Sequence, residues 1–150
     1  IITNKRISWP LGLNGGFQGS LTARDMTAFV ARVYGFRGKK LKEKIHFVQE
    51  FAEIGKFFDE PMANYSAGMR SRIGFGLSMA FDFDYYLIDE AGAVGDPAFA
   101  KKSKKLYEEK LAKSNVIMVS HNVDEIKQWC DKIVLLRDGN VDVFDDVDEG

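Results

Sequence analysis

The stretch YYLIDE, residues 85–90, constrains the fold of this chain more than any other feature. Its first four residues form a short apolar run of aromatic and branched side chains, which is typical of a strand buried on both faces of a sheet. A second run, NVIMVS at 115–120, predicts another buried strand. Between them Asp96-Pro97 predicts the start of a helix that runs to about residue 113. Strand, helix and strand in this order predict an α/β fold with parallel neighbouring strands.

Helical patterns occupy the first part of the chain. The Gly- and Asn-rich segment 12–20 predicts a loop, and Thr22 then fits the N-cap of a helix over 22–36. A second helix is expected over 39–55, with Gly55 at its stop. The apolar residues at helical spacing, which we expect to be buried, are Phe29, Val33 and Phe36 in the first helix and Ile45, Val48, Phe51, Ala52 and Ile54 in the second.

A third helix is expected over 67–80, with Ser66 as its N-cap. Gly74 and Gly76 weaken such a helix by ~1 kcal/mol each relative to alanine, which indicates close backbone packing there. Its apolar face would consist of Met69, Ile73, Leu77 and Ala80.

The last third of the chain predicts a short helix and a hairpin. The helix is expected to follow the strand at 115–120 and to end near Cys130. The segment 132–144 predicts two strands joined at Asp138-Gly139 or Gly139-Asn140.

Reactive side chains follow both predicted parallel strands. The first strand ends on Asp89 and Glu90, and the second ends on Ser120 and His121. Ligands bind beyond the carboxyl ends of strands in open α/β sheets, so these ends predict a site. A magnesium ion suits one such carboxylate together with substrate phosphates. The alternatives are that the two acids cap the next loop and that His121 is a structural group.

The start of the predicted third helix is a second candidate site. Free backbone N–H groups and the positive end of the helix dipole after Ser66 favour an anion. Arg70 and Arg72 either reinforce this field or serve the structure.

Composition excludes several classes of protein. The net charge of −1 gives no reason to favour nucleic acid as a partner. Two histidines and the single cysteine, Cys130, are too few for an all-His/Cys zinc cage and exclude an internal disulfide. No apolar run approaches the roughly 18 residues of a membrane span.

Taken together, these motifs resemble the nucleotide-binding domain of ATP-binding-cassette (ABC) transporters. YSAGM at 65–69 resembles the signature motif, and YYLIDE resembles the Walker B strand with its catalytic glutamate. GDPAF at 95–99 resembles the D-loop, and VSHN at 119–122 resembles the switch-histidine loop. The segments 7–25 and 65–90 narrow the resemblance to the ATPase subunits that export capsular polysaccharide in Gram-negative bacteria.

The resemblance implies a P-loop NTPase-like fold and a role for each motif. Asp89 would hold Mg²⁺, Glu90 would activate or orient the attacking water, and His121 would contact the γ-phosphate of ATP. The remaining residues would bind nucleotide: Ser66, Ala67, Gly68 and Met69 in the partner's ATP site, Asp96 between protomers, and Gln18 as the Q-loop glutamine.

The resemblance also implies a division of the chain and a set of partners. Residues 1–21 would be the Q-loop region, 22–80 the helical subdomain with the signature helix, and 81–150 the catalytic core. The subunit would form a homodimer, bind an integral membrane permease subunit, and lie on the cytoplasmic face of the inner membrane. No nucleic acid partner is expected.

Departures from the family pattern limit what the chain can do alone. The phosphate-binding P-loop occurs nowhere in the sequence, Ala67 and Met69 replace Gly and Gln, and Ala91 stands where Pro is common. We therefore expect an N-terminally truncated fragment that binds ATP poorly and does not hydrolyse it. The alternatives are an O-antigen or teichoic-acid exporter, a non-catalytic ABC-like module, and a soluble non-transport ABC ATPase.

Overall fold

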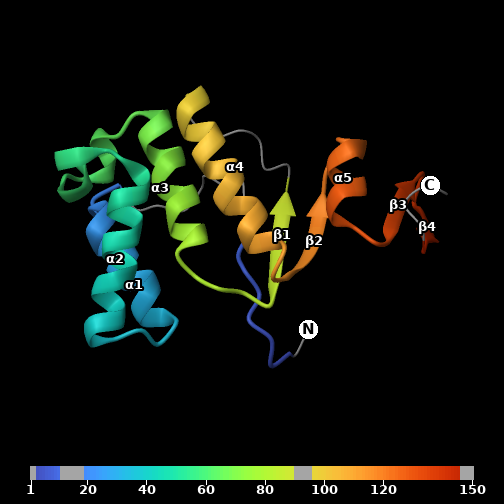
Figure 1. The fold of residues 1–150 in the computed structure, drawn as a ribbon, viewed down its shortest axis with the longest axis horizontal. Helices are drawn as coiled ribbons and strands as arrows, with labels where there is room; N and C mark the ends of the chain where they lie inside the picture. The colour runs from blue at the N-terminus through green and yellow to red at the C-terminus, as the bar shows by residue number, and fades with distance from the viewer. Residues whose placement is uncertain (1–2, 11–18, 90–95, 146–150) are drawn as a thin grey trace. The chain divides into compact units, whose positions relative to one another are not determined.

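The computed structural model describes residues 3–10, 19–89 and 96–145 (Figure 1). The chain divides into two compact units. We call residues 13–82 and 92–110 the helical unit, and residues 1–12, 83–91 and 111–150 the sheet unit.

The helical unit contains the first three predicted helices and nearly all of the fourth. Helix α1 (Ala23–Val33) packs on α2 (Gly38–Ala52), and α2 packs on α3 (Ala67–Met79), as Figure 1 shows. Two short 3₁₀ helices, η1 (Gly55–Asp59) and η2 (Met62–Asn64), connect α2 to α3. Helix α4 (Pro97–Leu111) follows β1 in the sequence, and all but its last residue belongs to this unit.

The predicted caps of α1 and α3 are confirmed. The Thr22 hydroxyl oxygen accepts a hydrogen bond from the backbone N–H of Asp25 at 3.0 Å, and the Ser66 hydroxyl oxygen accepts one from Met69 at 3.2 Å. Each cap satisfies one of the N–H groups that the first turn of a helix leaves without a partner.

The buried face of α1 is not the one that the spacing of large apolar residues predicts. Phe29 and Val33 are 60% and 67% exposed. The fully buried positions are instead Ala23, Thr27 and Ala31, which are spaced by four residues. The face of α1 that packs inward therefore carries small side chains, and its large apolar residues Phe29 and Val33 face solvent.

The stop of α2 also differs from the prediction. The helix ends at Ala52, and Glu53 takes the left-handed conformation at its end, with φ of 52°. Gly55 also has a positive φ, 57°, but it lies two residues beyond this cap. Lys102 of α4 forms an ion pair with Glu53 and donates to the carbonyl of Phe51 at 3.1 Å. These contacts come from α4 and favour a conformation that a non-glycine residue rarely adopts.

The core of the helical unit is built around Phe51. Its ring lies 5.9 Å from that of Phe47, 5.7 Å from that of Phe75 and 5.3 Å from that of Phe99. A Cβ atom at Gly76 would lie 3.2 Å from Cδ1 of Phe51. The close packing predicted from this glycine is therefore confirmed.

The sheet unit holds the predicted parallel pair. Strand β1 (Tyr85–Asp89) pairs with β2 (Asn115–Val119), and Asp89 lies opposite Val119. The segment 6–8 lies along β1 as well, since the N–H of Ser8 donates to the carbonyl of Tyr85 at 2.9 Å and Ser8 Oγ accepts from Leu87 N–H at 2.9 Å. Sequence patterns gave no sign of this pairing, because the segment is too short to show periodicity.

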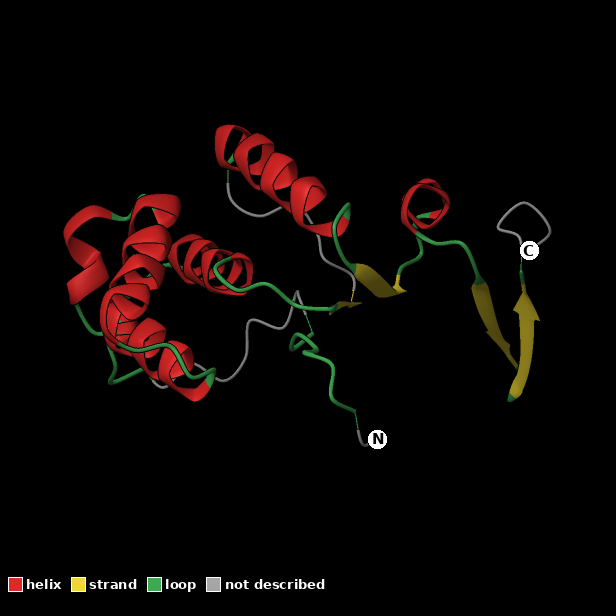
Figure 2. Cartoon of the chain, turned by 60° about the horizontal axis from the view of Figure 1, so that its bottom comes forward, coloured by secondary structure: helices red, strands yellow, loops and turns green. Residues whose placement is uncertain are grey.

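The rest of the sheet unit follows the predicted order. Helix α5 (Val123–Trp129) follows β2, and β3 (Ile133–Arg137) pairs antiparallel with β4 (Asn140–Phe144), as the yellow arrows in Figure 2 show. The turn between them carries positive φ at Asp138 and Gly139, 49° and 79°, which confirms the predicted hairpin.

The prediction that residues 115–120 form a fully buried strand is wrong. Ile117 and Val119 are 55% and 63% exposed, while Val116 and Met118 are half-buried. An apolar run fits a strand covered on both faces, but in the described part of the chain one face of β2 is left open. The alternation therefore separates a half-buried face from an exposed one.

Truncating Phe51 and Phe29 to alanine should separate the buried position from the exposed one. We expect Phe51→Ala to lower the free energy of unfolding by about 3–5 kcal/mol, because it removes the ring at the centre of the aromatic cluster. Phe29→Ala should change it by less than about 0.5 kcal/mol, because the ring is mostly in solvent. Urea titrations of both variants measure this difference, and equal losses would contradict the assigned core.

Candidate functional site

The carboxyl end of the parallel sheet carries Asp89 and His121. Asp89 is the last residue of β1 and is exposed, and its partner across the ladder, Val119, stands two residues before His121. Parallel pairing therefore brings the ends of both strands to one edge, as predicted from the sequence. Glu90 lies outside the described residues.

The turn after β2 is held by side chains on both sides of His121. The Ser120 hydroxyl donates to the Glu125 carboxylate at 3.1 Å and accepts from the N–H of Asn122 at 3.0 Å. Asn122 Oδ1 accepts from the N–H groups of Asp124 and Glu125 at 3.1 and 3.3 Å and so caps α5. The backbone on both sides of His121 is thereby fixed, and its side chain is exposed.

This edge could bind a hard cation such as Mg²⁺ only if a bound substrate supplied further oxygen ligands. In the described residues, no group of three or more His, Cys, Asp or Glu side chains could hold a metal ion. A single exposed carboxylate such as Asp89 fits the way Mg²⁺ is bound, which is through one or two carboxylates, waters and substrate phosphates.

The start of α3 presents the second group of predicted residues. Ser66 caps the helix, and Ser66, Ala67 and Gly68 are exposed while Met69 is half-buried. Beyond Met69, Arg70 turns back, and its Nη1 donates to the carbonyl of Tyr65 at 2.6 Å. Arg70 therefore serves the structure of this helix start.

Arg72 joins α3 to the start of α4. Its guanidinium forms an ion pair with Asp96, donates to the carbonyl of Ala52 at 3.3 Å, and lies 4.4 Å from the ring centroid of Phe99. Only 20% of the Arg72 side chain is exposed. A planar guanidinium can meet these groups together, so Arg72 has a structural role linking three segments of the helical unit.

Asp96 has its carboxylate engaged within the chain. Its Oδ1 accepts from the N–H groups of Ala98 and Phe99 at 3.0 and 3.1 Å, and its Oδ2 faces Arg72. The hydrogen bond from Phe99 N–H, the Arg72 guanidinium and the bond from Ala98 lower the pKa of Asp96 from its ordinary value. The carboxylate therefore acts as the N-cap that the sequence predicts for α4.

The predicted residues thus fall into separate groups. Asp89 and His121 belong to the sheet unit, whereas Ser66 to Met69 and Asp96 belong to the helical unit. Gln18 and Glu90 lie outside the described residues. Sequence reasoning left the role of Arg72 open and missed the buried Tyr65 beside Ser66, because both act through contacts distant in the sequence.

In the described part of the chain, no helix combines the length and apolar character needed to cross a membrane.

Comparisons with known proteins identify relatives across nearly the whole chain. The polysialic acid transport ATP-binding protein KpsT of Escherichia coli is 55% identical over 141 residues, which are 94% of this chain and 62% of that protein. The capsule polysaccharide export ATP-binding protein CtrD of Neisseria meningitidis serogroup B is 44% identical over 143 residues, 95% of this chain and 65% of that protein. The chain thus spans somewhat less than two thirds of these relatives. No protein-family model matches it.

A solved structure supports the fold. The ATP-binding subunit of an ABC transporter matches with a TM-score of 0.72 and 18% identity, covering 91% of this chain and 57% of that one. At this identity the match shows the fold alone, which is that of an ABC ATPase. The resemblance that the motifs indicate is confirmed.

The depressed pKa of Asp96 predicts how this helix start depends on pH. A carboxyl whose pKa is lower in the folded state stabilises the fold above its ordinary pKa of 3.8 and loses that effect as pH falls through the lowered value. We expect the gap in unfolding free energy between the wild type and Asp96→Asn to be constant near neutral pH and to narrow below about pH 4.

Urea titrations across this pH range measure the gap. Asp96→Ser keeps a capping oxygen without a charge. Its difference in unfolding free energy from the wild type should therefore narrow over the same pH range as that of Asp96→Asn. A gap that stays constant down to about pH 3 would show that the Asp96 charge does not stabilise the fold.

Proposed function

We propose that the chain belongs, over the residues it covers, to the ATP-binding proteins of capsule polysaccharide export ABC transporters, and that it is part of an ATPase subunit that drives export of capsular polysaccharide. The observation that carries the proposal is the 55% identity to the polysialic acid transport protein over 94% of the chain. The position of Asp89 and His121 at one sheet edge supports it.

The sheet edge would perform the chemistry on the γ-phosphate of ATP. Asp89 would hold Mg²⁺, which when bound offsets the charge on the phosphate oxygens. Glu90 would accept a proton from the attacking water or orient it, and His121 would donate to the γ-phosphate. Catalysis of this kind depends mostly on positioning and electrostatics, which suits side chains fixed at strand ends.

The helix start at Ser66 would serve the ATP of a second subunit. In the proposed homodimer, the exposed stretch Ser66 to Met69 would contact the partner's γ-phosphate, since free N–H groups at a helix start favour anions. Asp96 would lie near the dimer contact, and Gln18 would act as the Q-loop residue. Residues 1–150 contain no P-loop.

The proposed arrangement in the cell follows from the family. Residues 1–150 would be a partial ABC ATPase domain, with the Q-loop region at 1–21, the helical subdomain at 22–80 and the catalytic core at 81–150. The helical subdomain would contact an integral membrane permease subunit at the cytoplasmic face of the inner membrane.

Genetic complementation tests the export function. We expect the full-length protein to restore surface capsule to a bacterium that lacks its own capsule-export ATP-binding protein. Restored transport of O-antigen or teichoic acid instead would favour the related exporters. ATP hydrolysis with no restored transport of any polysaccharide would favour a non-transport ATPase.

Replacing Glu90 by Gln in the full-length protein tests the proposed chemistry. The variant keeps the size of the side chain but cannot accept a proton, so turnover should fall by at least about a hundredfold while ATP still binds. Phosphate release and binding of a fluorescent ATP analogue measure the two effects. Turnover at the wild-type rate would remove Glu90 from the mechanism.

A further inference from the structure

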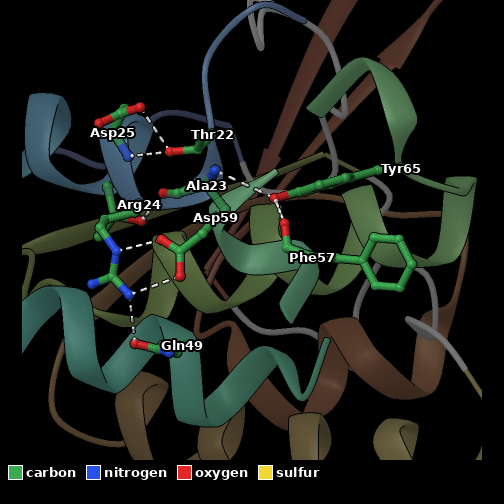
Figure 3. A network of polar contacts seen from close by, with 9 residues as sticks. Thr22, Ala23, Arg24, Asp25, Gln49, Phe57, Asp59 and Tyr65 are labelled. Atoms are coloured by element: carbon green, nitrogen blue, oxygen red, sulfur yellow. Dashed lines mark hydrogen bonds and ion pairs between the residues drawn. The ribbon is translucent and has the colours of Figure 1, made fainter. Parts of the chain in front are cut away.

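The residue before Ser66 is anchored more firmly than a helix cap requires. Tyr65 is 3% exposed, and its hydroxyl accepts from the N–H of Ala23 at 3.3 Å while donating to the carbonyl of Phe57 at 2.6 Å (Figure 3). Burial raises the pKa of this hydroxyl, which keeps it protonated and able to donate. One side chain therefore joins the first residue of α1 to η1.

The backbone of Tyr65 is held as well. Its N–H donates to the carbonyl of Met62 at 3.1 Å, and its carbonyl accepts from Arg70 at 2.6 Å. The residue is thus fixed at its hydroxyl, its N–H and its carbonyl. Ser66 follows directly, so its position is set relative to the first turn of α1.

Neighbouring contacts make this junction between α1 and η1 stiff. Arg24 donates through Nε and Nη2 to the carboxylate of Asp59 at 2.5 and 3.2 Å, and through Nη2 to Gln49 at 3.2 Å (Figure 3). Upstream, the N–H of Met62 donates to the carbonyl of Leu21 at 2.9 Å. A displacement of the segment before α1 therefore has to carry η1, η2 and Tyr65 with it.

We propose that Tyr65 is a positioning residue that couples the first turn of α1 to Ser66. The hydroxyl transmits the position of α1 to the exposed helix start that, under the proposed function, meets the partner's ATP. This inference rests on that proposed function, which gives Ser66 its role at the partner's ATP. It adds a route by which a displacement of the segment before α1 reaches Ser66. The coupling consists of the two hydrogen bonds of the Tyr65 hydroxyl, and no group is transferred.

Tyr65→Phe in the full-length protein tests the coupling, because it removes the hydroxyl and keeps the ring. With MgATP at saturation, we expect kcat per ATP-binding-competent molecule to fall about fivefold, as the loss of one ordinary hydrogen bond from a positioned group implies. Binding of a fluorescent ATP analogue should retain its Kd. Tyr34→Phe, which removes a phenol hydroxyl at the opposite end of α1, is the matched control and should keep the wild-type kcat.

The readouts separate positioning from mere stability. A purely structural role would reduce the number of molecules that bind ATP and leave kcat per binding molecule unchanged, which would overturn the proposal. Hydrogen exchange tests the contact itself, since Ala23 N–H at the start of α1 has Tyr65 as its acceptor and should lose protection in Tyr65→Phe; unchanged protection would overturn the proposal. A wild type without turnover would refute the proposed function instead.

A second variant covers the case in which Tyr65→Phe does not fold. Arg24→Gln breaks an ion pair whose side chains are 41% and 55% exposed, so the fold should tolerate it. Because it loosens the same junction, we expect kcat to fall about twofold. An unchanged kcat in Arg24→Gln would then overturn the coupling.

Discussion

Parallel pairing of β1 with β2 is the constraint on which the sheet unit depends. It fixes Asp89 opposite Val119 and so brings the turn that carries His121 to the same edge. Both strands are short. Hydrogen bonds of the Ser120 and Asn122 side chains hold the turn that follows β2. The edge that carries Asp89 and the turn at His121 is thus built from a small number of local contacts once two strands lie side by side.

Most of the element order could be predicted from the sequence, because the signals are local. Thr22, Ser66 and Asp96 cap helices by bonding to N–H groups within three residues, and such bonds need no knowledge of the rest of the fold. The hairpin at Asp138-Gly139 is equally local, since positive φ is a property of the turn itself. The placement of Asp89 and His121 followed from strand order and one general rule for parallel sheets.

What could not be predicted depends on partners distant in the sequence. Periodicity identified α1 but not its buried side, because more than one set of residues on α1 has helical spacing. Packing of α1 against α2 and η1 buries the set that contains Ala23 and leaves Phe29 exposed. An apolar run likewise does not reveal whether both faces of β2 are covered. The left-handed Glu53 was missed because its ion-pair partner, Lys102, lies on another helix. The hydroxyl of Tyr65 meets Ala23 across 42 residues, which no local pattern encodes.

The contacts of Arg72 also have a kinetic consequence. They reach 20 residues back to Ala52 and 24 residues forward to Asp96, so they require two long loops to close first. A tight hairpin such as β3–β4 closes within about 1–10 μs, because its partners are neighbours in the sequence. We therefore expect the Arg72–Asp96 pair, which needs both α3 and the start of α4, to form later in folding than the contacts between neighbours in the sequence.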